Sequence, residues 1–391
     1  MRPLSQPSRS RAPNSERERP GDSESPPAIS GTAPSPALPL LPQNIEELPA
    51  HPLAPWAHTS VVRSYLLIGA GFSHNWDGWL ASEAFEYLLG DPAVMANDKL
   101  RTLLWKHQNT GGFEAALDEL QREAEPGSQL DELQLRSAVR RMFDTMNSAF
   151  KSKGLEFRQP VGHDHPVRNF LLRFKAIFSL NQDLLLEYCY RGSKDGLVDH
   201  DDPCTERDWQ CPGMRVAAPP DATAVYPSAA GIWVPSANHV IEEGEQPIFK
   251  LHGSSNWRTA EGSDIMIVGG GKTPAIARYP VLQWYSKIFT EHLTQPDARL
   301  MVIGYSFRDE HINAALTQAI DGGLRLFVVD PLGADVASTI NPVPKTAIGY
   351  KPTSLEESLR KALIGASRRP MSSTFAKDEV ERQKIERFFV D

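Results

Sequence analysis

The sequence contains little cysteine and no long apolar segment. Its three cysteines, Cys189, Cys204 and Cys211, form no C-x-x-C pair, which excludes a disulfide framework and a four-cysteine zinc site. No stretch approaches the roughly 18 uninterrupted apolar residues that a membrane helix needs. The N-terminus also lacks the apolar core of a secretory signal peptide. We therefore expect a cytoplasmic protein that contacts no membrane.

An excess of positive charge is also absent. The 391 residues carry a net charge of -8, whereas binding to a phosphate backbone depends on clustered lysine and arginine. Nucleic acid is therefore not expected as the main ligand. Hydrophobic residues make up 40% of the chain and charged residues 23%, which is typical of a globular protein.

Aromatic residues are missing from positions 1–55, which hold 13 of the 32 prolines. Such a segment buries too little apolar surface to offset its ordering entropy, so we predict that it is disordered. We place an ordered domain at 56–345 and a C-terminal helical segment at 346–391. In that last segment Ser354 and Glu357 have the spacing of a capping box.

Short apolar runs recur along the ordered domain and predict an α/β fold. The runs lie at 64–68, 176–180, 247–251, 265–268, 300–304 and 324–329. Helical segments separate several of them, which favours a Rossmann-like parallel sheet with flanking helices. Between the first two runs, at about 80–172, amphipathic stripes such as Leu135, Val139, Met142, Met146 and Phe150 predict an inserted helical subdomain.

The first motif with chemical potential is Gly69-Ala70-Gly71-Phe72-Ser73, where a strand should meet a helix. Glycines let the backbone approach a pyrophosphate, and a helix N-terminus offers unpaired N–H groups. The motif lacks the third glycine of G-x-G-x-x-G. A tight structural turn would have the same sequence.

Two further motifs also follow predicted strands. Asn181 and Asp183 come directly after the run at 176–180, where ligand-contacting residues collect in open α/β sheets. Either residue could instead cap the next helix. His252, before Gly253, follows the run at 247–251 and has the chemistry of a general base, although a single histidine is more often structural.

The fourth motif is Ile303-Gly304-Tyr305-Ser306-Phe307-Arg308-Asp309-Glu310-His311-Ile312-Asn313. Gly304 permits close approach of a ligand, and Ser306 can hydrogen-bond a phosphate or a ribose; an ordinary strand–helix turn is the alternative. Asp330, after the run at 324–329, is a candidate contact to an adenosine ribose.

These four motifs, in this order, resemble the silent information regulator (sirtuin) superfamily, and more closely its prokaryotic antiphage-defence branch. The resemblance runs from about Ser64 to Asp330. It implies that Asn181 positions the nicotinamide ribose and the attacking water and that His252 is the general base. It also implies that Gly69, Ala70, Gly71, Ser73, Gly304 and Ser306 hold the phosphates and ribose of NAD.

The chain departs from deacylating sirtuins in two places. It reads His74-Asn75-Trp76-Asp77-Gly78-Trp79 where those enzymes carry an arginine-containing loop, and it has no cysteine beyond Cys211 to build their zinc module. Protein deacylation is therefore not expected. The resemblance implies an NAD glycohydrolase that uses NAD as substrate and water as acceptor, with no metal, and that depletes NAD during phage infection under control of a homo-oligomer or of a partner protein encoded nearby.

Other interpretations stay open. The same site would serve an ADP-ribosyltransferase or an NAD-sensing module without catalysis, and Asp199, Asp201 and Asp202 are the only visible acidic cluster for a nuclease. The segment Val268–Thr273 is glycine-rich, but Met266 stands where a phosphate-binding Walker loop requires glycine. We interpret it as a flexible basic loop.

Overall fold

The computed structural model describes residues 63–123, 127–157, 165–190, 209–217 and 231–390. His58–Asp391 forms one compact unit. None of the helices in these ranges combines the length and the apolar character that crossing a membrane requires. The predicted disordered segment 1–55 and the acidic cluster at 199–202 lie outside the described residues.

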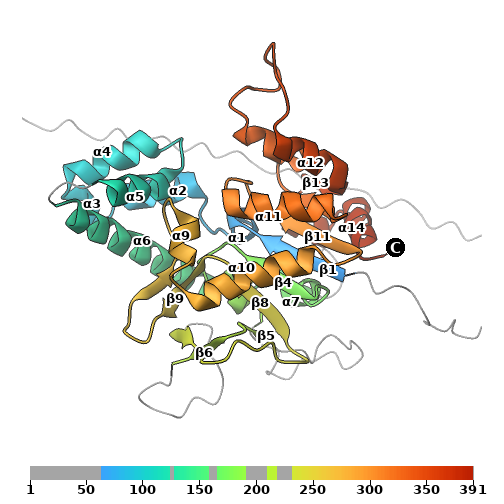
Figure 1. Ribbon diagram of the computed structural model, residues 1–391, viewed down its shortest axis with the longest axis horizontal. Helices are drawn as coiled ribbons and strands as arrows, with labels where there is room; N and C mark the ends of the chain where they lie inside the picture. The colour runs from blue at the N-terminus through green and yellow to red at the C-terminus, as the bar shows by residue number, and fades with distance from the viewer. Residues whose placement is uncertain (1–62, 124–126, 158–164, 191–208, 218–230, 391) are drawn as a thin grey trace, which may run out of the picture. The chain divides into compact units, whose positions relative to one another are not determined.

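A seven-stranded sheet forms the centre of the unit, and every strand pairing in it is parallel (Figure 1). The spatial order is β13, β12, β11, β1, β4, β8, β5. In chain order the strands are β1 (Arg63–Ile68), β4 (Ala176–Ser179), β5 (Trp209–Gln210), β8 (Gln246–Lys250), β11 (Ala298–Ile303), β12 (Arg325–Val329) and β13 (Leu363–Ser367). The predicted α/β class is confirmed.

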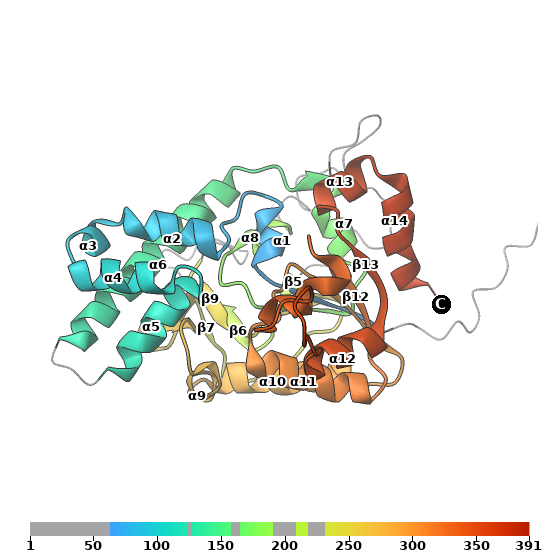
Figure 2. The same cartoon turned by 90° about the horizontal axis from the view of Figure 1, so that it is seen from above.

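Helices cover both faces of this sheet, which explains why its central strands are apolar runs rather than alternating patterns. Figure 2 shows one group of helices on each side. One face carries α10 (Pro280–Leu293), α11 (Glu310–Asp321) and α12 (Ser354–Ala362). The other carries α1 (Ala70–His74), α7 (Val167–Leu171), α8 (Leu185–Tyr188), α13 (Met371–Ala376) and α14 (Glu379–Glu386).

The segment between β1 and β4 contains a group of helices, as predicted. They are α2 (Ala81–Leu89), α3 (Pro92–Met95), α4 (Asp98–His107), α5 (Gly112–Arg122) and α6 (Ser128–Lys151). The predicted stripe from Leu135 to Phe150 is buried along α6. Asp91 and Asn97 cap α3 and α4 by accepting backbone hydrogen bonds. A short antiparallel pair, β2 (Glu156–Phe157) and β3 (His165–Pro166), leads back toward the main sheet.

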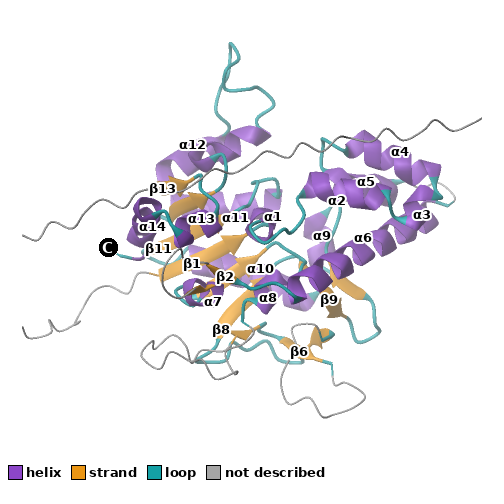
Figure 3. Cartoon of the chain, turned by 180° about the vertical axis from the view of Figure 1, so that it is seen from behind, coloured by secondary structure: helices purple, strands orange, loops and turns teal. Residues whose placement is uncertain are grey.

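One predicted strand of the main sheet lies elsewhere. The run at 265–268 contributes β10 (Asp264–Met266) to a separate four-stranded sheet with β6 (Met214–Val216), β7 (Trp233–Pro235) and β9 (Gly253–Arg258) (Figure 3). The physical reason is the turn after β8. Gly253 has φ +72°, and a Cβ there would collide with the carbonyl oxygen of Ile265, so the chain reverses into a new sheet.

The C-terminal segment 346–391, predicted to be helical, also supplies the edge strand β13, which pairs in parallel with β12. The sequence disguises this strand because Gly365 lies at its centre, and glycine weakens a strand pattern. The structure requires that glycine: a Cβ would lie 2.5 Å from the ring of Phe327. The short 3-10 helix η2 (Arg387–Phe389) completes the described elements of this segment, whereas η1 (Gly333–Ile340) precedes it, between β12 and α12.

Candidate active site

One row of paired residues crosses the main sheet, and the candidate site residues come directly after this row in the chain. Val329, Ile303, Ile68, Ser179 and Lys250 are consecutive partners on β12, β11, β1, β4 and β8. Gly69, Gly304 and Asp330 come one position after this row. Asn181 and His252 come two positions after it, on adjacent strands. Parallel strands lie roughly 4.8 Å apart, so the register alone brings together residues that are 71 positions apart in the chain.

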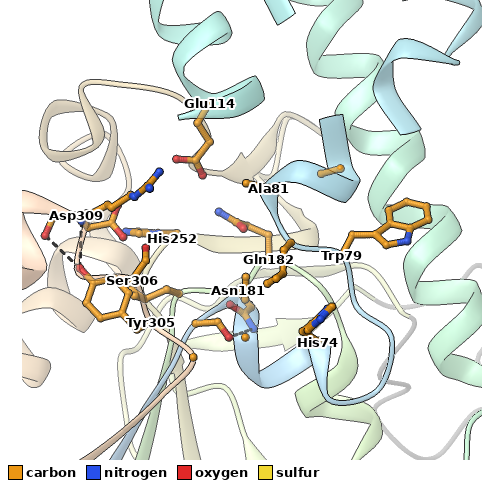
Figure 4. Close-up of a pocket in the computed structure, with 18 of the residues that line it drawn as sticks. His74, Trp79, Ala81, Glu114, Asn181, Gln182, His252, Tyr305, Ser306 and Asp309 are labelled. Carbon is orange, nitrogen blue, oxygen red and sulfur yellow. Dashed lines mark hydrogen bonds between the residues drawn. The ribbon is translucent and has the colours of Figure 1, made fainter. Parts of the chain in front are cut away.

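These strand ends open into a cavity of about 1460 Å³. That volume exceeds the roughly 300–1,000 Å³ of most small-ligand sites and suits an extended ligand. Asn181 and His252 line the same cavity, with Glu114 of the helical insertion above them (Figure 4). The other predicted residues that line it are Gly69, Ala70, Gly71, Asp183, Gly304, Ser306 and Asp330. Ser73 alone is not at the surface of the cavity.

The glycines of the first and fourth motifs pack against each other. The Gly71 N–H donates to the Gly304 carbonyl at 3.0 Å, and the Gly69 N–H donates to Ile303. Gly304 has φ +61°, and a Cβ on it would collide with the backbone of Gly71. Contact between the two turns is therefore sufficient to require glycine at both positions. The N–H groups of Gly69 and Gly71 already donate within the protein, so they are not available to a ligand. What the two turns allow is a close approach of the ligand to the backbone.

Hydrogen bonds link Asn181, Ser73 and Asp183 in a chain. We name these three residues the amide side of the cavity. The Asn181 amide donates to the Gly69 carbonyl at 2.9 Å and to Ser73 Oγ at 3.0 Å. Ser73 Oγ in turn donates to Asp183 Oδ2 at 2.9 Å, and Asp183 Oδ1 accepts from the Leu185 N–H. Because a carbonyl can only accept, the nitrogen of Asn181 must face Gly69. Its Oδ1 is the atom left for a ligand.

A buried ion pair supports the amide side from below. Lys250 Nζ lies 2.6 Å from Glu187 Oε1 and also donates to the Asp183 carbonyl at 2.6 Å. Both side chains are almost fully buried. Lys250 therefore ties the end of β8 to the loop that carries Asn181 and Asp183. The buried free thiols of Cys189 and Cys211 have pKa values raised by burial and are poor nucleophiles.

His252 is 1% exposed, and its Nε2 lies 3.1 Å from Nε2 of His311. Burial, with nearby Lys272, lowers the pKa of His252 from 6.5 to about 3. Burial also lowers the pKa of His311, at the start of α11. Both rings are therefore neutral at pH 7 in the free protein. We name His252, His311 and Asp309 the imidazole side of the cavity.

The imidazole side is bordered by Lys272, whose Nζ lies 2.6 Å from Asp309 Oδ1 and 2.9 Å from Glu114 Oε2. Burial alone would raise the pKa of Asp309, but Lys272 and His252 lower it below its usual range. The predicted loop is present at 268–271, but its extension to 273 is wrong, because Lys272 and Thr273 belong to a helix. Lys272 is largely buried, it is paired, and it begins the short helix α9 (Lys272–Ile276). Its partner Glu114 comes from the distant helical insertion, so local sequence could not reveal the pairing.

Ser306 and Asp330 line the cavity along β11 and β12. Ser306 is exposed. Asp330 Oδ1 accepts from the Leu332 N–H at 2.8 Å, and burial raises the pKa of the Asp330 carboxyl. Arg368, Arg369 and Met371, which follow β13, line the same cavity. The roles assigned to Ser306 and Asp330 remain predictions.

Several residues of the site were not predicted. Gln182, between Asn181 and Asp183, lines the cavity and donates to the Ile267 carbonyl. Asp309 and His311 lie in the fourth motif, but only its glycine and serine were expected to act. A D-x-H spacing at a helix start was the available sequence signal. His252, Asp309 and His311 also bring three potential metal ligands within 4.8 Å of one another, although no metal was expected.

Comparison with known protein families finds one match. Residues 175–332 match the SIR2-like domain family. The match begins just before β4 and ends after β12, so it includes Asn181, His252 and Ser306 but not the first glycine motif. No curated protein matches the chain.

Matches to solved structures comprise 23 chains. One of them, described as "Structural Basis for the Mechanism and Regulation of Sir2 Enzymes", has 11% identity and a TM-score of 0.29. The alignment covers 78% of this chain and 92% of that chain.

Proposed function

We propose that the protein is an NAD glycohydrolase, which cleaves NAD to nicotinamide and ADP-ribose. The observation that carries this proposal is the pairing of an anchored amide and a neutral imidazole, Asn181 and His252, at the ends of adjacent strands in one cavity. The match to the SIR2-like domain supports NAD as the substrate.

Asn181 is the positioning group for the reacting ribose. Both of its amide hydrogens are donated within the protein, so Oδ1 accepts from a ribose hydroxyl or from the attacking water. Because Ser73 and Asp183 fix the amide, the acceptor is already oriented before the ligand binds. Such preorganisation contributes to catalysis by holding reactants near the attack geometry.

His252 is the general base. As the bond between nicotinamide and C1′ of the ribose breaks, nicotinamide leaves with the electron pair and C1′ becomes cationic. Water then adds to C1′ and loses a proton, which His252 accepts. A neutral imidazole is required for this step, and burial keeps His252 neutral.

The rest of the dinucleotide lies along the strand ends. We place the phosphates beside the turns at Gly69, Ala70, Gly71 and Gly304, where the missing Cβ atoms allow close approach. Ser306 and Asp330 then face the second ribose. Water is the acceptor because the sequence lacks the cysteine pairs of the zinc module that accompanies deacylation.

The direct test measures the release of nicotinamide from NAD by chromatography. It compares the full chain with Asn181→Ala and His252→Ala. We expect each variant to lose at least about 100-fold in rate, as removal of a general base does. His239→Ala, which removes a histidine outside the cavity, should keep the parent rate. Equal rates in all four proteins would refute the proposal. Labelled ADP-ribose accumulating on protein would instead identify an ADP-ribosyltransferase.

We also propose an antiphage role, which rests on the resemblance of the segment from Gly304 to Asn313 to the defence branch. An enzyme that depletes NAD must be restrained in healthy cells, so a regulatory partner encoded nearby or a controlled homo-oligomer is part of this proposal. Infected cells carrying the parent chain should lose NAD and restrict phage, whereas cells carrying Asn181→Ala should not. If the purified chain is inactive, the nicotinamide assay is repeated with the products of neighbouring genes.

A further inference from the structure

The imidazole side contains more ligand chemistry than the proposed reaction uses. His252 is needed as a base, but His311 and Asp309 have no part in the cleavage of NAD described above. One potential ligand atom from each of these three residues lies within 4.8 Å of the others. All three residues line the cavity, so the cluster is open to solutes on one side.

The separation of the two imidazoles fits a shared metal ion. Their Nε2 atoms lie 3.1 Å apart. Two imidazole nitrogens bound to one zinc ion are each roughly 2.0–2.1 Å from it and therefore roughly 3 Å from each other. Without a metal, one of the two rings must donate a hydrogen to the other.

The tautomer of His252 favours a metal ligand. Its ring also hydrogen-bonds the backbone of Leu180, whose N–H is already donated to Ile68, so the carbonyl of Leu180 is the acceptor. Since Nε2 faces His311, Nδ1 is the nitrogen that donates to Leu180. Nε2 therefore presents a lone pair toward His311. A carbonyl that fixes the second nitrogen in this way is the usual outer partner of a metal-binding histidine.

The donor set and the surrounding charge select the kind of ion. Two imidazoles and one carboxylate suit zinc and other first-row transition metals, whereas magnesium and calcium prefer oxygen alone. Three protein ligands also leave a position for water. Lys272 and Arg308 are the cations that line the cavity near this cluster among the described residues, and Glu114 and Asp309 offset the charge of Lys272.

We propose that His252, His311 and Asp309 form a binding site for a transition-metal dication of the zinc class, and that the bound ion inhibits the enzyme. Inhibition follows because the ion takes the Nε2 lone pair that His252 needs as a base. This second half rests on the proposed function, whereas the binding site itself does not.

Binding is measured on the full chain without an affinity tag, after treatment with a chelator, by titration with Co²⁺. We expect visible absorption bands of bound Co²⁺ that reach a plateau at one ion per chain and that Zn²⁺ abolishes by displacement. His311→Gln should weaken binding by at least the roughly 10–100-fold that loss of an outer partner costs. The matched control is His74→Ala, which removes another cavity histidine and should bind like the parent.

Absence of Co²⁺ bands in the parent, or equal binding by parent and His311→Gln, would overturn the metal site. Asp309→Asn gives a second test if His311→Gln does not fold, because it should weaken binding as well. Nicotinamide release should fall as Zn²⁺ fills the site and recover with chelator, and unchanged release at full occupancy would overturn the inhibitory half. If the parent releases no nicotinamide either alone or with the products of neighbouring genes, the proposed function fails, but the Co²⁺ titration still decides the site.

Discussion

The two sides of the cavity are built in different ways. On the amide side, Asn181, Ser73 and Asp183 form a continuous hydrogen-bonded chain. The Asn181 amide and the Ser73 hydroxyl donate all their hydrogens to protein acceptors. On the imidazole side, two ring nitrogens face each other, and the number of hydrogens that they carry depends on pH and on bound ions. The first arrangement fixes one geometry, whereas the second has several states that differ by a proton or a cation.

The two sides of the cavity are therefore suited to different roles. A group that must position a ribose gains from having one conformation, since orientation is its contribution. A base must change its protonation state during the reaction, so its surroundings must permit that change. We therefore expect damage to the amide side to appear as lost stability and geometry, and damage to the imidazole side as altered response to pH and metal.

The largest expected effect comes from breaking the ion pair below the amide side. Lys250→Met should lower the free energy of unfolding by about 3–5 kcal/mol, because it leaves Glu187 buried without its cation. Urea unfolding measures the change. The double variant Lys250→Met with Glu187→Gln removes both charges and should recover most of the loss. A single variant as stable as the parent would show that the pair does not organise this side.

A smaller loss should follow when the amide side is broken in the middle. Ser73→Ala removes one acceptor and one donor, leaving one amide hydrogen of Asn181 and Oδ2 of Asp183 without their partner, which should cost about 1–3 kcal/mol. Nicotinamide release should fall at the same time, because Asn181 is no longer fixed. The control is Ser306→Ala, an exposed serine of the same cavity whose loss should change stability by less than about 0.5 kcal/mol. Equal effects of Ser73→Ala and Ser306→Ala on stability would show that the hydrogen bonds of Ser73 do not stabilise the amide side.

The imidazole side should respond mainly to pH. The pKa of His252 is about 3 in the folded protein and 6.5 without its surroundings, so between these values only the unfolded chain binds the proton. Stability should therefore fall as pH decreases below 6.5, by at most about 1.4 kcal/mol per pH unit for one such group. His252→Gln should show a shallower decrease between pH 7 and 5, measured with chelator present. His292, whose pKa is also lowered by burial, contributes equally to both proteins. Parallel curves of stability against pH for the parent and His252→Gln would contradict the lowered pKa of His252.

Sequence predicted the central fold and the position of Asn181 and Asp183 because both follow from strand ends, but it placed Ser73 against the ligand, and Ser73 does not line the cavity. The run before Gly69 and the run before Asn181 are mostly apolar, so each could be recognised as a buried strand followed by turn or polar residues. On the imidazole side, His252 was also predicted from its strand end, but its neighbours His311 and Lys272 were not. His252 and His311 are 59 positions apart, and Lys272 gains its partner Glu114 from a helix inserted far upstream. β13 was missed because its central Gly365 fits a contact with Phe327 that exists only after the sheet has formed.

One contact links the two extremes of the described fold. The Met371 N–H donates to Oδ1 of Asn75, 296 positions earlier, just after the helix that follows the first glycine motif. Arg368, Arg369 and Met371 wall the cavity at this point. During synthesis, the ribosome must therefore pass Met371 before this wall can close. A growing polypeptide that already contains Asn181 and His252 still lacks the wall formed by Arg368, Arg369 and Met371, so the cavity is completed late in synthesis.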